Sequence, residues 1–258
     1  MTLLGHARKS EGRRFVRVLA FLIIGFPAIA QPAILSAPLS ADEVMEHVVQ
    51  MNEMRAKALE GYSSLRTYHL ECHCLSHKKA DMVVRTAYQA PNRKAFTIVS
   101  ESGSGTVRRR VFKKLLEAEQ ESMREENQQR SAVTPQNYTF QVSDYQKTDT
   151  GEFYVLQAEP RRKNKFLFRG RIWVNAKDFA ITRIEGEPAV NPSWWTVKTD
   201  FQRTYQKIGD FWLPESNEST TKVRVFGTAV LTIKYREYQI IPAGAAEASS
   251  PGPMPTGQ

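Results

Sequence analysis

The stretch FRGRIWVNAKDFAITRIEG, residues 168–186, decides the fold class. Two runs of alternating apolar and polar residues flank Ala176-Lys177, and TYQKIGDFWLPESNEST, residues 204–220, repeats the pattern around Gly209-Asp210. Alternation with a period of two is typical of strands that bury one face, and the short polar breaks are typical of hairpin turns. The sequence therefore predicts an antiparallel sheet as the main structure of this chain.

The same alternation extends over most of the chain. It predicts strands at residues 65–76, 82–88, 94–99, 138–147, 152–158, 165–175, 179–185, 196–207, 211–219 and 228–240. A sheet of about ten strands must curl, because strand twist accumulates. We therefore expect a mainly β (α+β) fold, in which a strongly curved antiparallel sheet forms an unclosed half-barrel.

Two amphipathic helices interrupt the strands. The first begins at a capping box formed by Ser40 and Glu43 and ends near Glu60, before Gly61. The second runs from about Val107 to Gln129. A helix with one apolar face must pack on something, so we expect both helices to cover the concave face of the sheet.

The amino terminus has the pattern of a secretory signal. Basic residues precede a short apolar run, Val18–Ile24, and the small-residue triplet Ala28-Ile29-Ala30 follows. The run is too short for a spanning helix, although an uncleaved anchor is the alternative. We expect a periplasmic protein with a signal peptide at 1–30, a linker at 31–39, one half-barrel domain at 40–241 and a disordered tail at 242–258.

Charge and motifs exclude several classes of function. Removal of residues 1–30 takes away five basic residues and one acidic residue, which lowers the formal net charge from +9 to +5. This mild charge and the expected export argue against a nucleic-acid partner. The sequence contains no phosphate loop, dinucleotide fingerprint, nucleophile elbow or HExxH motif. We therefore expect a monomer that is not an enzyme, with no catalytic residue and no cofactor.

Three of the five histidines and both cysteines lie within nine residues: His69, Cys72, His73, Cys74 and His77. Imidazole and thiolate are ligands for zinc or copper. On a regular strand, however, the cysteines point to one face and the histidines to the other, where alternate residues are about 7 Å apart. We therefore expect buried free thiols, a solvated row of histidines and no metal site; an exported metal-binding protein is the alternative.

Three groups of residues are candidates for ligand contact. The more apolar faces of the strands would line the concave side of the sheet with Tyr68, Leu70, Phe96, Ile98, Phe166, Phe168, Ile172, Val174, Leu231, Ile233 and Tyr235. Trp194 and Trp195 are a candidate gate to this cavity or a membrane contact. Arg108, Arg109 and Arg110 form a basic collar, suited to anionic headgroups or an acidic partner.

Several motifs resemble those of the LolA-like family of periplasmic lipoprotein carriers and related regulators. They are Leu65-Arg-Thr-Tyr68, Gln89-Ala-Pro-Asn-Arg93, Gly170-Arg-Ile-Trp-Val174, Ile181-Thr-Arg-Ile184 and Tyr205-Gln-Lys-Ile-Gly-Asp-Phe-Trp-Leu-Pro214. The resemblance, from about Ala41 to Ile240, implies an unclosed barrel with a helical lid over an apolar cavity. It also implies a non-enzymatic carrier for the acyl chains of lipoproteins or another amphiphile, in peripheral contact with the membrane. The alternative is a regulatory module that senses lipid or protein in the envelope and binds a protein partner there.

The signal-peptide hypothesis predicts cleavage after Ala30. Expression of the full chain in a Gram-negative host should yield a periplasmic protein whose intact mass corresponds to residues 31–258. A membrane-bound species that retains Met1 would contradict the prediction.

Overall fold

The computed structural model describes residues 39–73, 77–191, 196–224 and 227–244. The expected signal peptide, the linker up to residue 38, Cys74, Trp194, Trp195 and the tail beyond residue 244 lie outside the described residues. Within the described residues, no helix is long and apolar enough to cross a bilayer.

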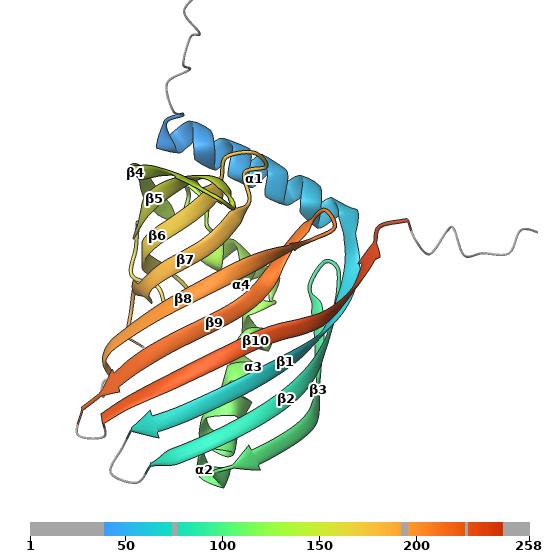
Figure 1. Ribbon diagram of the computed structural model, residues 1–258, viewed down its shortest axis with the longest axis vertical. Helices are drawn as coiled ribbons and strands as arrows, with labels where there is room; N and C mark the ends of the chain where they lie inside the picture. The colour runs from blue at the N-terminus through green and yellow to red at the C-terminus, as the bar shows by residue number, and fades with distance from the viewer. Residues whose placement is uncertain (1–38, 74–76, 192–195, 225–226, 245–258) are drawn as a thin grey trace, which may run out of the picture. The chain divides into compact units, whose positions relative to one another are not determined.

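Ten strands form one antiparallel sheet that does not close, as the alternation predicts (Figure 1). The strands are β1 (Leu59–His73), β2 (Lys78–Gln89), β3 (Arg93–Gly103), β4 (Tyr138–Thr148), β5 (Gly151–Pro160), β6 (Phe168–Asn175), β7 (Ile181–Pro188), β8 (Thr196–Ile208), β9 (Phe211–Val223) and β10 (Gly227–Pro242). The helical elements are α1 (Ala41–Ala58), α2 (Gly105–Val107), the π-helical turn η1 (Arg108–Phe112), α3 (Lys113–Ser122) and α4 (Glu125–Ser131). The expected half-barrel fold class is confirmed.

The strand order is β3-β2-β1-β10-β9-β8-β7-β6-β5-β4. Two meanders, β1–β3 and β4–β10, therefore meet where β1 pairs with β10 in the interior of the sheet. This arrangement places β3 and β4, which are consecutive strands, at opposite edges. The segment between them, α2 to α4, has to cross a face of the sheet, and Figure 1 shows it behind the strands.

The first helix begins as expected but ends differently. The hydroxyl of Ser40 accepts a hydrogen bond from the Glu43 amide at 3.3 Å, and the Glu43 carboxylate accepts one from the Ser40 amide at 2.8 Å. The helix ends at Ala58 because Leu59 is already extended and opens β1. Gly61 lies within the strand, where a Cβ would come within 2.6 Å of the Tyr88 carbonyl oxygen. Glycine is therefore required at this position because β1 and β2 lie close together there, and not because the helix ends at it.

The single helix expected at 107–129 is divided into shorter elements. A π-helical turn separates α2 from α3, and the path breaks again between Ser122 and Glu125. At that break the buried side chain of Asn127 donates a hydrogen bond to the Glu121 carbonyl oxygen at 2.8 Å. Carbonyls at the end of a helix lack partners within the helix, so Asn127 stabilises the end of α3.

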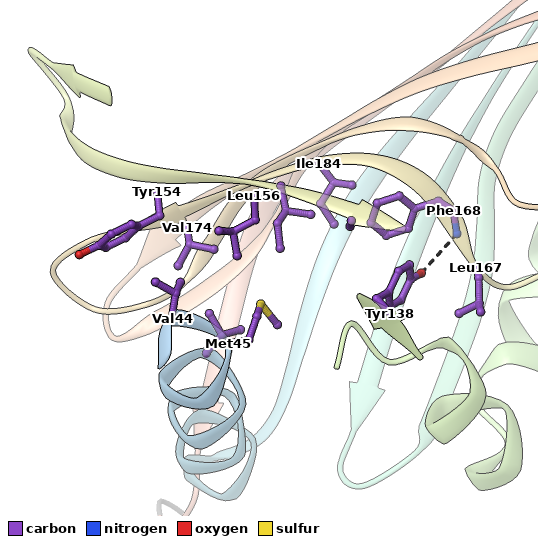
Figure 2. Packing of buried hydrophobic residues seen from close by; sticks show 12 residues of the cluster. Val44, Met45, Tyr138, Tyr154, Leu156, Leu167, Phe168, Val174 and Ile184 are labelled. Carbon is purple, nitrogen blue, oxygen red and sulfur yellow. Dashed lines mark hydrogen bonds between the residues drawn. The ribbon is translucent and has the colours of Figure 1, made fainter. Parts of the chain in front are cut away.

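One hydrophobic core lies between α1 and strands β4–β7. Figure 2 shows Val44 and Met45 of α1 near Leu156 and Val174, with Tyr138 near Phe168. The Tyr138 hydroxyl accepts a hydrogen bond from the Phe168 amide at 3.3 Å. This core is filled by side chains of the helix and the strands together.

A second core lies between the crossing segment and the other half of the sheet. It buries residues of β1, β2 and β10 against two residues of the crossing segment: Tyr68, Leu70, Ala80, Met82, Val84, Ile233, Val107 and Phe112. The Tyr68 and Phe112 rings lie 5.9 Å apart between centroids. The crossing segment is therefore packed on the sheet from α2 to α3.

A buried ion network ties α3 to the sheet. Arg66 of β1, only 2% exposed, places Nη1 2.7 Å from Glu119 Oε2, and Lys94 of β3 places Nζ 2.7 Å from Glu119 Oε1. The Arg66 guanidinium also lies 4.9 Å from the centre of the Tyr235 ring. Burial alone would raise the pKa of Glu119, but Lys94 and Arg66 outweigh it and hold that pKa below its usual value. Burial likewise opposes the charge of Arg66, and Glu119 raises the pKa of Arg66 in spite of it.

Two facing glycines allow β6 and β7 to approach closely. Gly170 is paired with Gly186. A Cβ at Gly170 would overlap the Glu185 carbonyl oxygen, and a Cβ at Gly186 would overlap that of Arg169. Since backbone cannot move as a flexible side chain can, both positions exclude larger residues.

We predict that Gly170→Ala destabilises the protein by about 3 kcal/mol, the cost of forced overpacking. Gly209→Ala is the control, because Gly209 has a φ of +58° but no atom within 4 Å of its Cβ position. Backbone strain alone should cost this variant about 1 kcal/mol. Urea unfolding would measure both, and equal losses would contradict the steric explanation.

We predict that Glu119→Gln costs about 3 kcal/mol, because it leaves Arg66 buried without its carboxylate. Glu117→Gln is the control: Glu117 lies on the same helix, is exposed and is 3.9 Å from Lys113, so its loss should cost less than about 0.5 kcal/mol. The pKa of Glu119 is lower in the folded protein than its value of 4.5 in the unfolded chain. The ionised carboxylate therefore stabilises the folded state fully above pH 4.5, and this stabilisation is lost as the pH falls through the lower pKa of the folded state.

The stability difference between wild type and Glu119→Gln should therefore narrow as the pH is lowered below 4.5. Urea unfolding at a series of pH values would measure it. A difference that does not change with pH, or equal losses in the two variants, would contradict the proposed role of the network.

Candidate functional site

A cavity of about 520 Å³ lies between β2–β3 and the helical elements η1 and α3. Its apolar lining comes from Met82, Phe96 and Ile98 of the strands and Leu116 of α3. Ile98 is 51% exposed, although it lies on the same face of β3 as Phe96, because the cavity is open over it. This arrangement offers apolar surface that the protein itself does not cover.

The rim of this cavity is basic. Arg108, Arg109 and Lys113 line it together with Glu101 and Glu117. Arg108 Nη1 is 3.3 Å from Glu101 Oε2, and Lys113 Nζ is 3.9 Å from Glu117 Oε1. Arg109 has no acidic partner among the described residues. It is therefore the cation of the rim that remains available to an anionic group.

The π-helical turn brings these cations to the cavity. In η1 the Lys113 amide donates to the Arg108 carbonyl oxygen, one residue further back than in an α-helix. Turns of this kind are frequent at functional sites. The buried side chains of Val107 and Phe112 fix the two ends of the turn against the sheet, while Arg109 is exposed. Local backbone geometry thus positions the basic rim.

A second cavity, of about 370 Å³, lies on the other side of α3, over β1 and β8–β10. Tyr68, Ile233 and Tyr235 contribute to its lining together with Arg203 and Glu119. Burial raises the pKa of Tyr235 and of Tyr68, so both phenols are protonated at neutral pH. This cavity is lined by hydrogen-bonding groups as well as apolar ones.

The residues expected to line one concavity lie in several places. Phe168, Ile172 and Val174 are buried in the core beneath α1. Tyr68, Leu70 and Ile233 are buried in the second core, and Leu231, Tyr235 and Phe96 pack against it. Phe166 precedes β6, which begins at Phe168 rather than residue 165, and its ring lies 4.8 Å from Lys165 Nζ.

The structure brings Phe96 and Ile98 into one cavity with Arg108 and Arg109. Arg110, the third arginine of the expected collar, is exposed and does not line this cavity. Of these two neighbouring arginines, Arg109 therefore lines the cavity and Arg110 does not.

The prediction of free thiols is wrong for Cys72, which is disulfide-bonded. The prediction assumed a regular strand over residues 65–76, whereas the described part of β1 is Leu59–His73. Alternation does hold for His69, which is on the face opposite Cys72, with Nδ1 2.7 Å from Asp81 Oδ1.

Sequence reasoning missed the polar residues that shape the site. They are Arg66, Lys94 and Glu119, which form the ion network between the sheet and α3. A signal was present for Arg66, because strand alternation puts it on the same face as Tyr68 and Leu70. Glu119 likewise follows Leu115 by one helical turn. When one element has a cation on its apolar face and another has an anion on its own apolar face, the two side chains are candidates for a buried ion pair.

No curated protein matches the chain. Several solved structures are similar to the chain at low identity. A DUF1329 family protein from Desulfovibrio piger is 10% identical, with a TM-score of 0.40, and the match covers 80% of this chain and 95% of that one. A LolA superfamily protein from Nitrosomonas europaea is also 10% identical, with a TM-score of 0.36 and coverage of 79% and 94%.

A domain from Vibrio parahaemolyticus described as an outer membrane lipoprotein-sorting protein is 11% identical, with a TM-score of 0.42 and coverage of 79% and 94%. A family model matches residues 79–238, more than half of the chain, from β2 to β10. The chain therefore belongs to the family of unknown function DUF5686.

Proposed function

We propose that this protein is an exported, non-enzymatic carrier in the cell envelope that binds an amphiphile with an anionic headgroup. The acyl chain occupies the cavity beneath η1 and α3, and the headgroup lies at its basic rim. The observation that carries the proposal is one cavity with an apolar floor, Phe96, Ile98 and Leu116, and at its edge an arginine, Arg109, that has no acidic partner in the part of the chain that the structure describes.

The size and lining of the cavity suit a single acyl chain. Its volume of about 520 Å³ falls within the range of small-molecule sites. Each methylene transferred from water contributes about 0.8 kcal/mol, so several methylenes on this apolar floor bind with useful affinity. The cavity is open to solvent, which suits a ligand that is taken up and released again.

Selectivity for an anionic headgroup would come from Arg109. Arg108 and Lys113 are each close to a carboxylate of the rim, Glu101 and Glu117. A ligand carboxylate or phosphate must compete with those glutamates at Arg108 and Lys113, but not at Arg109. A planar guanidinium also binds such groups through two parallel hydrogen bonds.

The cargo class follows from the same geometry. A lipoprotein, a free fatty acid and a phospholipid all present hydrocarbon chains that fit the apolar floor, and the fatty acid and the phospholipid also carry an anionic head for the rim. Among them we propose lipid-linked cargo of the envelope, because the expected signal peptide delivers the protein to the periplasm. Binding and release require no catalytic group.

The experiment compares a fluorescent fatty acid with its methyl ester, which has the same chain and no charge. Wild-type residues 31–258 should bind both and should prefer the acid. Arg109→Gln should weaken binding of the acid about fivefold, the worth of about 1 kcal/mol for an exposed charge pair, and should leave the ester unchanged. Ile98→Asp should weaken both, because it places a charge on the apolar floor.

Arg110→Gln is the matched control, since it removes the same charge from the adjacent residue, which does not line the cavity. Equal effects of Arg109→Gln and Arg110→Gln on the acid would contradict the assignment of the headgroup. Unchanged affinity in Ile98→Asp, with the fold intact by circular dichroism, would contradict the assignment of the cavity.

A further inference from the structure

Two histidines and a glutamate converge at the β1–β2 end of the sheet. Glu71 and His73 are alternate residues near the end of β1, and His77 directly precedes β2. One carboxylate oxygen and one ring nitrogen from each histidine all lie within 4.8 Å of one another. The two imidazole rings are nearly perpendicular, with centroids 5.2 Å apart.

This convergence differs from the row of separated histidines that the sequence predicts. On a continuous strand, alternate side chains of one face are about 7 Å apart, and residues four apart are about twice as far. His77 directly precedes β2, which runs antiparallel to β1, so His77 is not part of that row. The change of direction between the two strands brings His77 beside His73 instead.

The geometry points to a binding site for a divalent transition metal ion, with zinc as the ion that we assign. Two imidazoles and one carboxylate are a ligand set that zinc accepts, with water completing a tetrahedral site. Ligand atoms on one zinc ion lie about 3.4 Å apart, since each bond is about 2.1 Å long. The three atoms lie within 4.8 Å of one another, so they need to close by at most about 1.4 Å. Both histidines are exposed, so rotation of their side chains can supply this movement.

The surrounding charges favour an exchangeable ion rather than a permanent one. Lys79 Nζ lies 2.8 Å from Glu71 Oε1, so the ammonium group now occupies one side of the carboxylate. A metal ion would replace or share that positive charge. His69, the remaining histidine of the strand, is 2.7 Å from Asp81 and is not part of the cluster.

The site lies where the crossing segment leaves the sheet. The Ser104 amide donates a hydrogen bond to the Lys79 carbonyl oxygen at 2.8 Å, and Gly103 is paired with Ala80. The strand that follows His77 therefore holds the start of α2, and α2 leads directly into the π-helical turn with Arg109. An ion at this position would stabilise the end of the hairpin from which the crossing segment begins.

The test titrates zinc into metal-free residues 31–258, prepared without an affinity tag, in competition with a chromophoric chelator. We expect about one zinc ion per chain. Substitution of any one of the three ligands, Glu71→Gln, His73→Gln or His77→Gln, should weaken binding by at least about tenfold. His69→Gln is the matched control, because it removes an exposed histidine of the same strand, and it should bind zinc as the wild type does.

Zinc should also raise the thermal midpoint of the wild type and of His69→Gln, and not that of His73→Gln, because an ion that binds only the folded state stabilises it. All four positions are solvent-accessible, so circular dichroism should show folded variants. The proposal is overturned if wild-type binding equals that of the three-ligand variant Glu71→Gln/His73→Gln/His77→Gln. It is also overturned if His69→Gln loses as much affinity as His73→Gln.

Discussion

The arrangement of this domain depends on a single carboxylate, that of Glu119, held between two cations of the sheet. Because β3 and β4 are consecutive in the chain but lie at opposite edges, the helical segment between them has to cross the concave face. Apolar contacts of Val107 and Phe112 hold its beginning. Further along α3, Glu119 ties the helix to β1 through Arg66 and to β3 through Lys94.

The helix that this network anchors, α3, contributes side chains to both cavities. Leu116, Glu117 and Gln120 line the cavity over β2–β3, whereas Leu115, Ala118 and Glu119 line the one over β8–β10. Movement of α3 away from the sheet would leave the buried Arg66 without its carboxylate partner. Ion pairs of this kind are costly to break and add little net stability when formed, so they define an arrangement more than they strengthen it.

Much of the fold follows from local pattern. Alternation located all ten strands, and the capping box located the start of α1, because both signals reside in a few neighbouring residues. Strand partners were not accessible in this way: nothing in the alternation of β1 indicates that it pairs with β10. At the break between α3 and α4 the Asn127 side chain bonds the Glu121 carbonyl oxygen, a contact that periodicity does not reveal. The cavity at Arg109 required both the strand pairing and the π-helical turn, so only its individual residues were predicted.

The pairing of the first strand with the last also bears on how the domain acquires its structure. Leu59 is paired with Pro242 and His73 with Thr228, so these contacts join segments separated by most of the domain. Contacts at such separation carry a large loop-closure cost, and proteins dominated by them fold slowly. Until β10 is in place, β1 and β9 each have an unpaired edge that can bind other chains. Because β10 pairs with both of these strands, its docking removes two exposed edges of the sheet at once.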